Sequence, residues 1–442
     1  MKRMTFTAAA ALLALAALQG RAAADGTPAV PTTPATWQPQ GAVLAGAATT
    51  ADAPAMKADV TYRDTIKPGQ TRMYGIALDA KSSAYASAFA LPPPGSRVVY
   101  GDGLELTLQS ADGDDCDTRE AHFGDDGDAR PIGSAVARTI GSPDDACQDA
   151  NQYTLQVHRT SSGTSDPGAW PLELRYVSEP GLKPGATALP APATGSASPT
   201  PLTAGTPRQA SGGPSFETAA AVKTGIWKDR VLPGETRFYK VPVDWGQQAT
   251  VFADFSSAQV TEPDSYTGSG VRLTAYSPVR QLVDDDEGSY DGTPTSLVQQ
   301  LAPVAYANRL ADDDTVQRVR YAGWYYFAVT VHPDVAKAIK GQVPVTLRVQ
   351  VKGTAQAAPG YDGSPRRAGI GIDAHDVSSA DGAATGGGSS SSALRFVAFA
   401  AMGAGTVLLL TLAAWYATAR RRATGPADAT PQQPGYGPPQ RW

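Results

Sequence analysis

Short stretches of alternating apolar and polar residues recur along the middle of the chain. Residues 104–108, 153–157 and 172–176 each place an apolar side chain at every second position. Alternation with a period of two buries one face of a β-strand and leaves the other face in water. Gly, Pro and Asp residues that favour turns separate these stretches. The pattern therefore predicts antiparallel β-sandwiches rather than a parallel α/β sheet.

One motif occurs twice. Residues 68–74 read PGQTRMY and residues 233–239 read PGETRFY. The predicted strands that follow also match in order: 84–90 with 249–255, 104–108 with 271–275, 153–157 with 324–329, and 170–176 with 343–349. Several strands in one order at similar spacing indicate an internal repeat. The sequence thus predicts an all-β fold of two tandem antiparallel jelly-roll-like sandwiches, joined to one C-terminal transmembrane helix and long disordered linkers.

Composition sets the borders between the predicted segments. They are a signal peptide (1–24), a disordered spacer (25–57), a first sandwich (58–178), a Pro-rich linker (179–214), a second sandwich (215–353), a Gly/Ser/Ala-rich stalk (354–393), a transmembrane helix (396–419) and a cytoplasmic tail (420–442). Pro-rich segments form extended spacers and Gly/Ser-rich segments form flexible coils. We therefore expect two sandwiches that are not rigidly docked on each other.

Two apolar segments predict where the chain resides. Lys2 and Arg3 precede an apolar run, and the small residues at 22–24 suit a signal peptidase that cleaves before Asp25. Residues 396–419 have the length of a membrane-spanning helix. The arginines that follow this helix favour the cytoplasmic side; they are Arg420, Arg421 and Arg422. We expect a single-pass type I protein of the cell membrane with an extracellular N-terminal part and a short cytoplasmic tail.

The charge balance argues against nucleic acid as a partner. The formal net charge is -5 and the pI is about 5.5, so the chain lacks a basic footprint. Frequent Ala, Gly, Pro, Asp and Arg with scarce Lys are typical of a high-GC bacterial genome.

The repeated motif at the start of an alternating sandwich resembles bacterial pre-peptidase C-terminal-like domains, which are jelly-roll modules of secreted enzymes and surface proteins. The second repeat, stalk and spanning helix are similar to the membrane-proximal part of actinobacterial single-pass proteins, several of which carry a von Willebrand A domain. That domain is missing here. No Asp-x-Ser-x-Ser metal motif occurs either, because residues 254–257 and 376–379 both break its spacing. The resemblance implies a fold and an envelope location, without metal-dependent adhesion.

The chain contains two cysteines, Cys116 and Cys147. In an exported protein a pair of cysteines predicts a disulfide, with two free thiols as the alternative.

Acidic residues follow the same strand in each repeat. They are Asp112, Asp114 and Asp115 after residues 104–108, and Asp284, Asp285 and Asp286 after residues 271–275. Carboxylates that converge on one loop suit calcium, which binds six to eight oxygens. Neither run has the spacing of an EF-hand, so solvated acidic turns are the alternative. No other cofactor is expected.

The motifs of common hydrolases and nucleotide-binding enzymes are missing, and no two histidines have metal-ligand spacing. We therefore expect a non-enzymatic, membrane-tethered interaction or scaffold module that binds an envelope protein. Trp324 and Tyr326 fall on the outward face of a predicted strand, where they would contact sugars or a partner; core packing is the alternative. A module that binds cell-wall glycan, or a hydrolase with an unrecognised site, are the other hypotheses.

Overall fold

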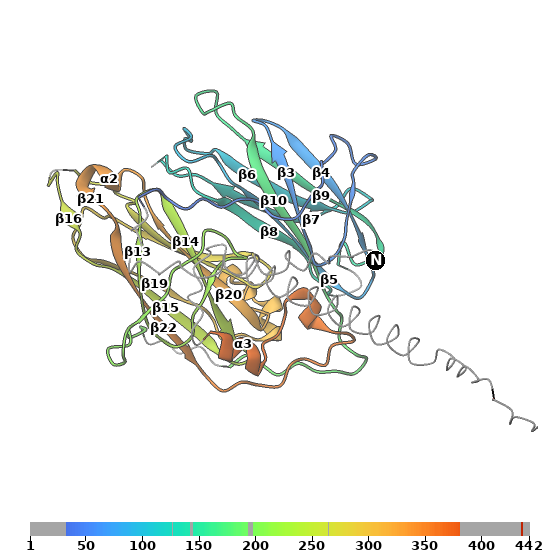
Figure 1. Cartoon of the computed structure of the whole chain (residues 1–442). Coiled ribbons are helices and arrows are strands. Elements are labelled where there is room, and N and C mark those ends of the chain that lie inside the picture. Colours follow the sequence, from blue (N-terminus) through green and yellow to red (C-terminus); the bar gives the residue numbers. More distant parts are fainter. Residues whose placement is uncertain are drawn as a thin grey trace, which may run out of the picture. The chain divides into compact units, whose positions relative to one another are not determined.

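The computed structural model describes residues 32–125, 127–141, 145–192, 198–263, 265–380 and 435 (Figure 1). The predicted signal peptide, the stalk from residue 381 onwards, the predicted spanning helix at 396–419, and Arg420, Arg421 and Arg422 lie outside these residues. Within them, no helix has both the length and the apolar composition needed to cross a membrane.

The first sandwich consists of two five-stranded sheets. The first sheet has the order β1 (Ala42–Val43), β3 (Val60–Ile66), β10 (Trp170–Glu179), β5 (Ser83–Ala90) and β8 (Ile132–Arg138). The second sheet has the order β2 (Ala55–Met56), β4 (Thr71–Leu78), β9 (Asn151–Thr160), β6 (Gly103–Gln109) and β7 (Asp115–His122). Apolar side chains of both sheets form one core, so the sheets pack face to face.

The second sandwich repeats this arrangement. Its sheets have the orders β11 (Arg208–Gln209), β13 (Gly225–Val231), β22 (Val343–Lys352), β15 (Gln248–Phe255), β19 (Thr295–Gln300), and β12 (Ala220–Ala221), β14 (Glu235–Val243), β20 (Gly323–Val331), β17 (Val271–Tyr276), β18 (Leu282–Gly288). The remaining elements are β16 (Gln259–Val260), β21 (Ile339–Lys340), η2 (Tyr306–Leu310), α1 (Asp314–Gln317), α2 (Val335–Ala338), η3 (Pro365–Ala368) and α3 (Ala374–Ser379).

Strand order confirms the internal repeat. Numbering the eight long strands of each sandwich along the chain gives sheet orders 1-8-3-6 and 2-7-4-5 in both copies. This is the connectivity of a jelly roll, in which two Greek keys form two packed sheets. The predicted alternation is also confirmed, because Leu104, Leu106 and Leu108 on β6 are all buried.

The repeated PG-x-TR-x-Y motif forms a structural clamp. In the first copy the Tyr74 hydroxyl donates to Asp64 Oδ2 at 2.8 Å, and the Gly46 amide donates to the same oxygen at 2.8 Å. Arg72 Nη1 donates to the Gly46 carbonyl at 2.8 Å. The motif therefore fastens the chain that precedes each sandwich onto its first two strands.

The second copy makes the same three contacts. Tyr239 and the Gly212 amide donate to Asp229 Oδ2 at 2.6 and 2.8 Å. Arg237 Nη1 donates to the Gly212 carbonyl at 2.9 Å. The residues of the motif that carried the family resemblance therefore have a structural role in holding each sandwich together.

Three segments predicted to be unstructured are partly ordered. The spacer contributes β1, β2 and the buried Trp37. The Pro-rich linker lies along β22, where Gln350 Nε2 donates to the carbonyl of Thr200 at 2.6 Å. The start of the stalk returns to the first sandwich, where the buried Tyr361 contacts Glu179. Composition is misleading here because a few anchored side chains order an otherwise polar segment.

Candidate functional site

The two sandwiches meet in a buried junction, contrary to the expectation that they are not rigidly docked. The outward face of β5, β8 and β10 packs against the outward face of β14, β17 and β20. Tyr85, Ala137 and Val177 of the first sandwich belong to the same apolar cluster as the core of the second. A shared core holds the domains together whatever the composition of the linker between them.

Aromatic side chains fill the centre of the junction. Phe216, just before β12, contacts Phe89 of the first sandwich with ring centroids 4.9 Å apart. It also contacts Phe238, Tyr276 and Tyr326 of the second sandwich at 4.9 to 5.3 Å. We call these five residues the aromatic cluster. Such tilted and edge-to-face contacts add to the free energy gained from burying apolar area.

A buried ion pair lies beside the aromatic cluster. Arg280 of the second sandwich, 3% exposed, donates from Nη1 to Oε1 of the fully buried Glu173 at 2.8 Å. Arg280 also pairs with Glu217. Burial raises the pKa of the Glu173 carboxyl, and Arg280 opposes this shift. For Arg280, burial lowers the pKa but Glu217 and Glu173 outweigh it, so the guanidinium stays charged.

A second buried carboxylate joins three parts of the chain. Glu179 accepts hydrogen bonds from the hydroxyls of Tyr85 at 2.5 Å and Tyr361 at 2.7 Å. Tyr361 belongs to the segment after the second sandwich, so this contact ties that segment to the first sandwich. Burial raises the pKa of Glu179, while both tyrosines and Arg320 lower it.

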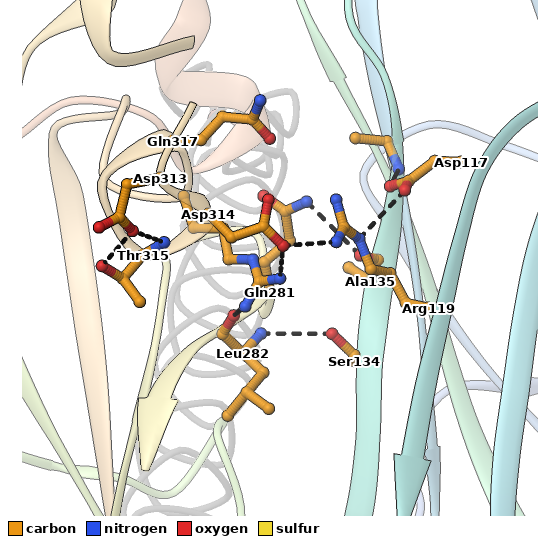
Figure 2. Close-up of polar contacts among 12 residues, drawn as sticks. Asp117, Arg119, Ser134, Ala135, Gln281, Leu282, Asp313, Asp314, Thr315 and Gln317 are labelled. Carbon is orange, nitrogen blue, oxygen red and sulfur yellow. Dashed lines mark hydrogen bonds and ion pairs between the residues drawn. The ribbon is translucent and has the colours of Figure 1, made fainter. Parts of the chain in front are cut away.

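Figure 2 shows the polar edge of the junction. Arg119 on β7 pairs with Asp117 at 3.0 Å and reaches across to Asp314 Oδ2 at 2.8 Å. Gln281 donates to the carbonyl of Ala135 on β8 at 3.5 Å. These polar contacts fix the orientation of one sandwich on the other, and they do so without burying apolar surface.

An N-terminal arm, which we define as residues 32–40, lies across the junction. Trp37 is 6% exposed and packs on Phe89, Phe216 and Phe238 at 5.2 to 5.7 Å. Its Nε1 donates to Glu173 Oε2 at 3.1 Å. The arm therefore contacts both sandwiches.

A groove of about 210 Å³ remains open along the arm. Its walls include Pro92 and Pro94 of the first sandwich, and Thr236 and Thr330 of the second. A further polar cleft of about 170 Å³ lies beside it, and both are lined by Arg130 and Pro131. Ligand sites in proteins commonly occupy such domain boundaries.

The predicted disulfide is confirmed. Cys116 and Cys147 are bonded, and they connect β7 with the loop that precedes β9.

The acidic runs do not form the predicted calcium loops. Asp284, Asp285 and Asp286 lie on β18, where alternation sends Asp285 to the opposite face from the other two. Asp285 pairs instead with Arg272. Asp112, Asp114 and Asp115 are exposed around a turn. Among the residues that the structure describes, no three His, Cys, Asp or Glu side chains are arranged to hold a metal ion.

Trp324 and Tyr326 point outward from β20, as the alternation predicts, but they do not form an open aromatic pair. Tyr326 packs against Phe216 at the junction, 5.0 Å between ring centroids. Trp324 is half-buried, with Lys240 Nζ 5.0 Å from its ring. The aromatic excess on this strand has two causes, because Tyr325 and Phe327 lie in the core of the second sandwich and Tyr326 packs at the junction.

Comparison of the two repeats contains a signal for the junction. Tyr276 pairs with Tyr326 on β17 and β20, and the equivalent pair on β6 and β9 is Gln109 with Thr154. This pair is aromatic in the second sandwich and polar in the first. The difference indicates that this outer sheet face is packed against other residues in the second sandwich only. Trp37, Glu173 and Arg280 have no comparable signal, because each lies alone in a segment of unremarkable sequence.

Comparison with solved structures finds several weak likenesses. The pre-peptidase C-terminal domain of collagenase from Bacillus anthracis is 13% identical, with a TM-score of 0.19 over 28% of this chain and 94% of that one. Tripeptidyl peptidase 2 is 9% identical, with a TM-score of 0.20 over 67% of this chain and 24% of that one. A CBM22 tandem domain of Paenibacillus barcinonensis Xyn10C is 11% identical, with a TM-score of 0.16 over 66% and 86%.

No protein-family model and no curated protein matches the sequence. The likenesses to solved structures are too weak to carry an argument about function. The assignment of two β-sandwiches rests on the strand order and the cores.

Proposed function

We propose that this chain is a non-enzymatic interaction or scaffold module of a bacterial cell envelope. In this proposal residues 396–419 anchor it in the membrane as a single-pass type I protein, and the two jelly-roll sandwiches lie outside. An actinobacterial origin fits the composition and the resemblance to actinobacterial single-pass proteins. The partner is an envelope protein.

One observation supports this role above the others. The buried ion pair of Glu173 and Arg280 joins the sandwiches, as does the aromatic cluster, and Glu179 ties the segment after the second sandwich to the first. The result is a single body with a fixed relation between two sandwiches. A preorganised body of this kind binds a partner with little loss of conformational entropy.

Wall glycan is the alternative ligand. The half-buried Trp324 beside Lys240 offers one aromatic ring for stacking on a sugar. Because Tyr326 is engaged at the junction, this alternative depends on a single ring.

The test is an affinity capture of the intact tagged protein from mildly solubilised membranes, followed by analysis of bound proteins and polysaccharide. A stoichiometric envelope protein that is retained by a Trp324→Ala variant would support the proposal. Polysaccharide captured without protein, and lost in Trp324→Ala, would favour the glycan alternative. Turnover of generic esterase, glycosidase or peptidase substrates would overturn the non-enzymatic assignment.

A further inference from the structure

We propose that the junction is an acceptor site for a tryptophan-bearing extended peptide of a partner, and that the N-terminal arm occupies this site as a built-in ligand. The inference rests on the proposed interaction function, because it names the class of partner. It concerns the arm, Glu173, Glu235 and the aromatic cluster, which together have the features of a peptide-binding cleft.

The anchor of the arm is the indole of Trp37. Its ring is bounded by Phe89 of the first sandwich and by Phe216 and Phe238 of the second, and its N–H donates to Glu173 at 3.1 Å. A buried aromatic ring with one satisfied polar atom is the usual anchor of a protein interface. We call the three rings around Trp37 the aromatic box; they are those of Phe89, Phe216 and Phe238. The box is built from both sandwiches, so it exists only while they are docked.

Carboxylates from both sandwiches hold the backbone of the arm. The amide of Ala35 donates to Glu235 Oε1 at 3.1 Å, and the amide of Gln40 donates to Glu173 Oε2 at 2.8 Å. Any extended peptide presents such amides, so these contacts recognise a backbone while the box recognises the tryptophan. In the described part of the chain, residues 32–40 make no backbone-to-backbone hydrogen bond with either sandwich.

The two copies of the motif differ at the residue that holds the arm. In the first copy Gln70 Oε1 accepts from the Lys67 amide at 3.0 Å. In the second, Glu235 Oε2 accepts from the equivalent Leu232 amide at 3.0 Å, and its other oxygen accepts from Ala35 and pairs with Arg237. A glutamine has one side-chain oxygen, so glutamate adds the acceptor that the arm uses.

Space beside the arm extends the site. The groove of about 210 Å³ follows residues 35–39 and has rigid proline walls, including Pro92, Pro94 and Pro131. A peptide with a bulkier residue beside its tryptophan would fill volume that the arm leaves open. The occupant that fits is therefore an extended, proline-flanked segment with one tryptophan, as in the arm itself.

The test uses the full chain with Trp37→Ala and a fluorescent peptide of residues 32–41, followed by anisotropy. We expect the peptide to bind Trp37→Ala at least tenfold more tightly than wild type, whose own arm fills the box. A matched peptide with alanine for tryptophan should bind Trp37→Ala at least tenfold more weakly than the tryptophan peptide. Equal binding of both peptides to a folded Trp37→Ala chain would overturn the proposal.

A second variant keeps the experiment decisive if Trp37→Ala does not fold. Trp37→Phe retains a ring in the box and lacks the indole N–H, and it should also bind the tryptophan peptide more tightly than wild type. Doubling of the wild-type mass in ultracentrifugation, lost in Trp37→Phe, would overturn the assignment to a partner in favour of a second copy of the chain. Affinity capture with Trp37→Ala should retain at least tenfold more envelope protein than wild type, and the peptide of residues 32–41 should release it. Captured protein that neither the variant nor the peptide affects would overturn this inference and leave the proposed function standing.

Discussion

Arg280 and Glu173 illustrate how a single buried ion pair specifies the docking of two domains. Burying both charges costs about as much free energy as their attraction returns, so such pairs add little net stability. Any other arrangement of the sandwiches would leave one charge buried without its partner. The pair therefore selects one orientation, while the aromatic cluster supplies most of the favourable free energy.

Replacing Arg280 with Met should destabilise the chain strongly. Glu173 would remain buried without its main partner, and the free energy of unfolding should fall by about 3–5 kcal/mol in urea titrations. Arg366→Met is the matched control, because Arg366 pairs with Asp373 and Asp376 in a largely exposed setting. The control should lose less than about 1 kcal/mol. Equal losses for the two variants would contradict the assigned role of the buried pair.

Glu179→Gln should change the pH dependence of stability. Burial raises the pKa of Glu179 above its ordinary value of 4.5, although Tyr85, Tyr361 and Arg320 oppose the shift. Between pH 4.5 and the raised pKa the folded state binds a proton that the unfolded state does not. The stability that this group contributes is therefore present below pH 4.5 and is lost as pH rises through the folded pKa.

The measurement is the Tm of wild type and Glu179→Gln from pH 4 upwards. Wild type should lose Tm relative to the variant as the pH increases above 4.5. Glu120→Gln, at an exposed position on β7, is the control for the loss of one carboxylate. Parallel curves for wild type and Glu179→Gln would show that Glu179 titrates alike in both states.

At the scale of elements, each sandwich depends on a close approach between its preceding segment and its motif strand. A Cβ on Gly212 would lie 2.7 Å from the Tyr239 ring and 2.9 Å from the Arg237 Cβ. Gly46 meets Tyr74 in the same way at 2.7 Å. The clamp thus requires glycine for space rather than for an unusual backbone conformation.

Gly212→Ala should destabilise the second sandwich by about 1–3 kcal/mol, because the buried Tyr239 ring has little room to move. Gly163→Ala is the control, since a Cβ there meets no atom within 4 Å. Chemical denaturation of both variants measures the difference. A Gly212→Ala chain as stable as Gly163→Ala would mean that the clamp relaxes without cost.

At the scale of the whole molecule, the shared core predicts that both sandwiches unfold together. Scanning calorimetry of the wild-type chain should show one transition for the sandwiches. Phe216→Ala removes the centre of the aromatic cluster and should separate the transition into two. Phe123→Ala is the matched control, because Phe123 packs on Trp170 inside the first sandwich and its loss should lower the Tm of the single transition without dividing it. Two transitions in the wild type would contradict a shared cooperative core.

The sequence by itself determined the local features of this protein. Alternation predicted the strands, the PG-x-TR-x-Y motif predicted two copies of one fold, and the cysteine pair predicted the disulfide, because each signal lies within a short stretch of chain. Strand periodicity also placed Tyr326 correctly on an outward face. What that face contacts is not encoded in the period.

Only the tertiary structure decided how these parts are used. Trp37 lies in a Pro-rich spacer, Glu173 on β10 and Arg280 after β17, and nothing in their spacing relates them. Their contacts arise from burial of one sheet face on another, which depends on the combined surface of two domains rather than on any local pattern. For the same physical reason, segments with the composition of linkers became ordered, since a single buried ring such as Trp37 or Tyr361 is enough to fix the chain around it.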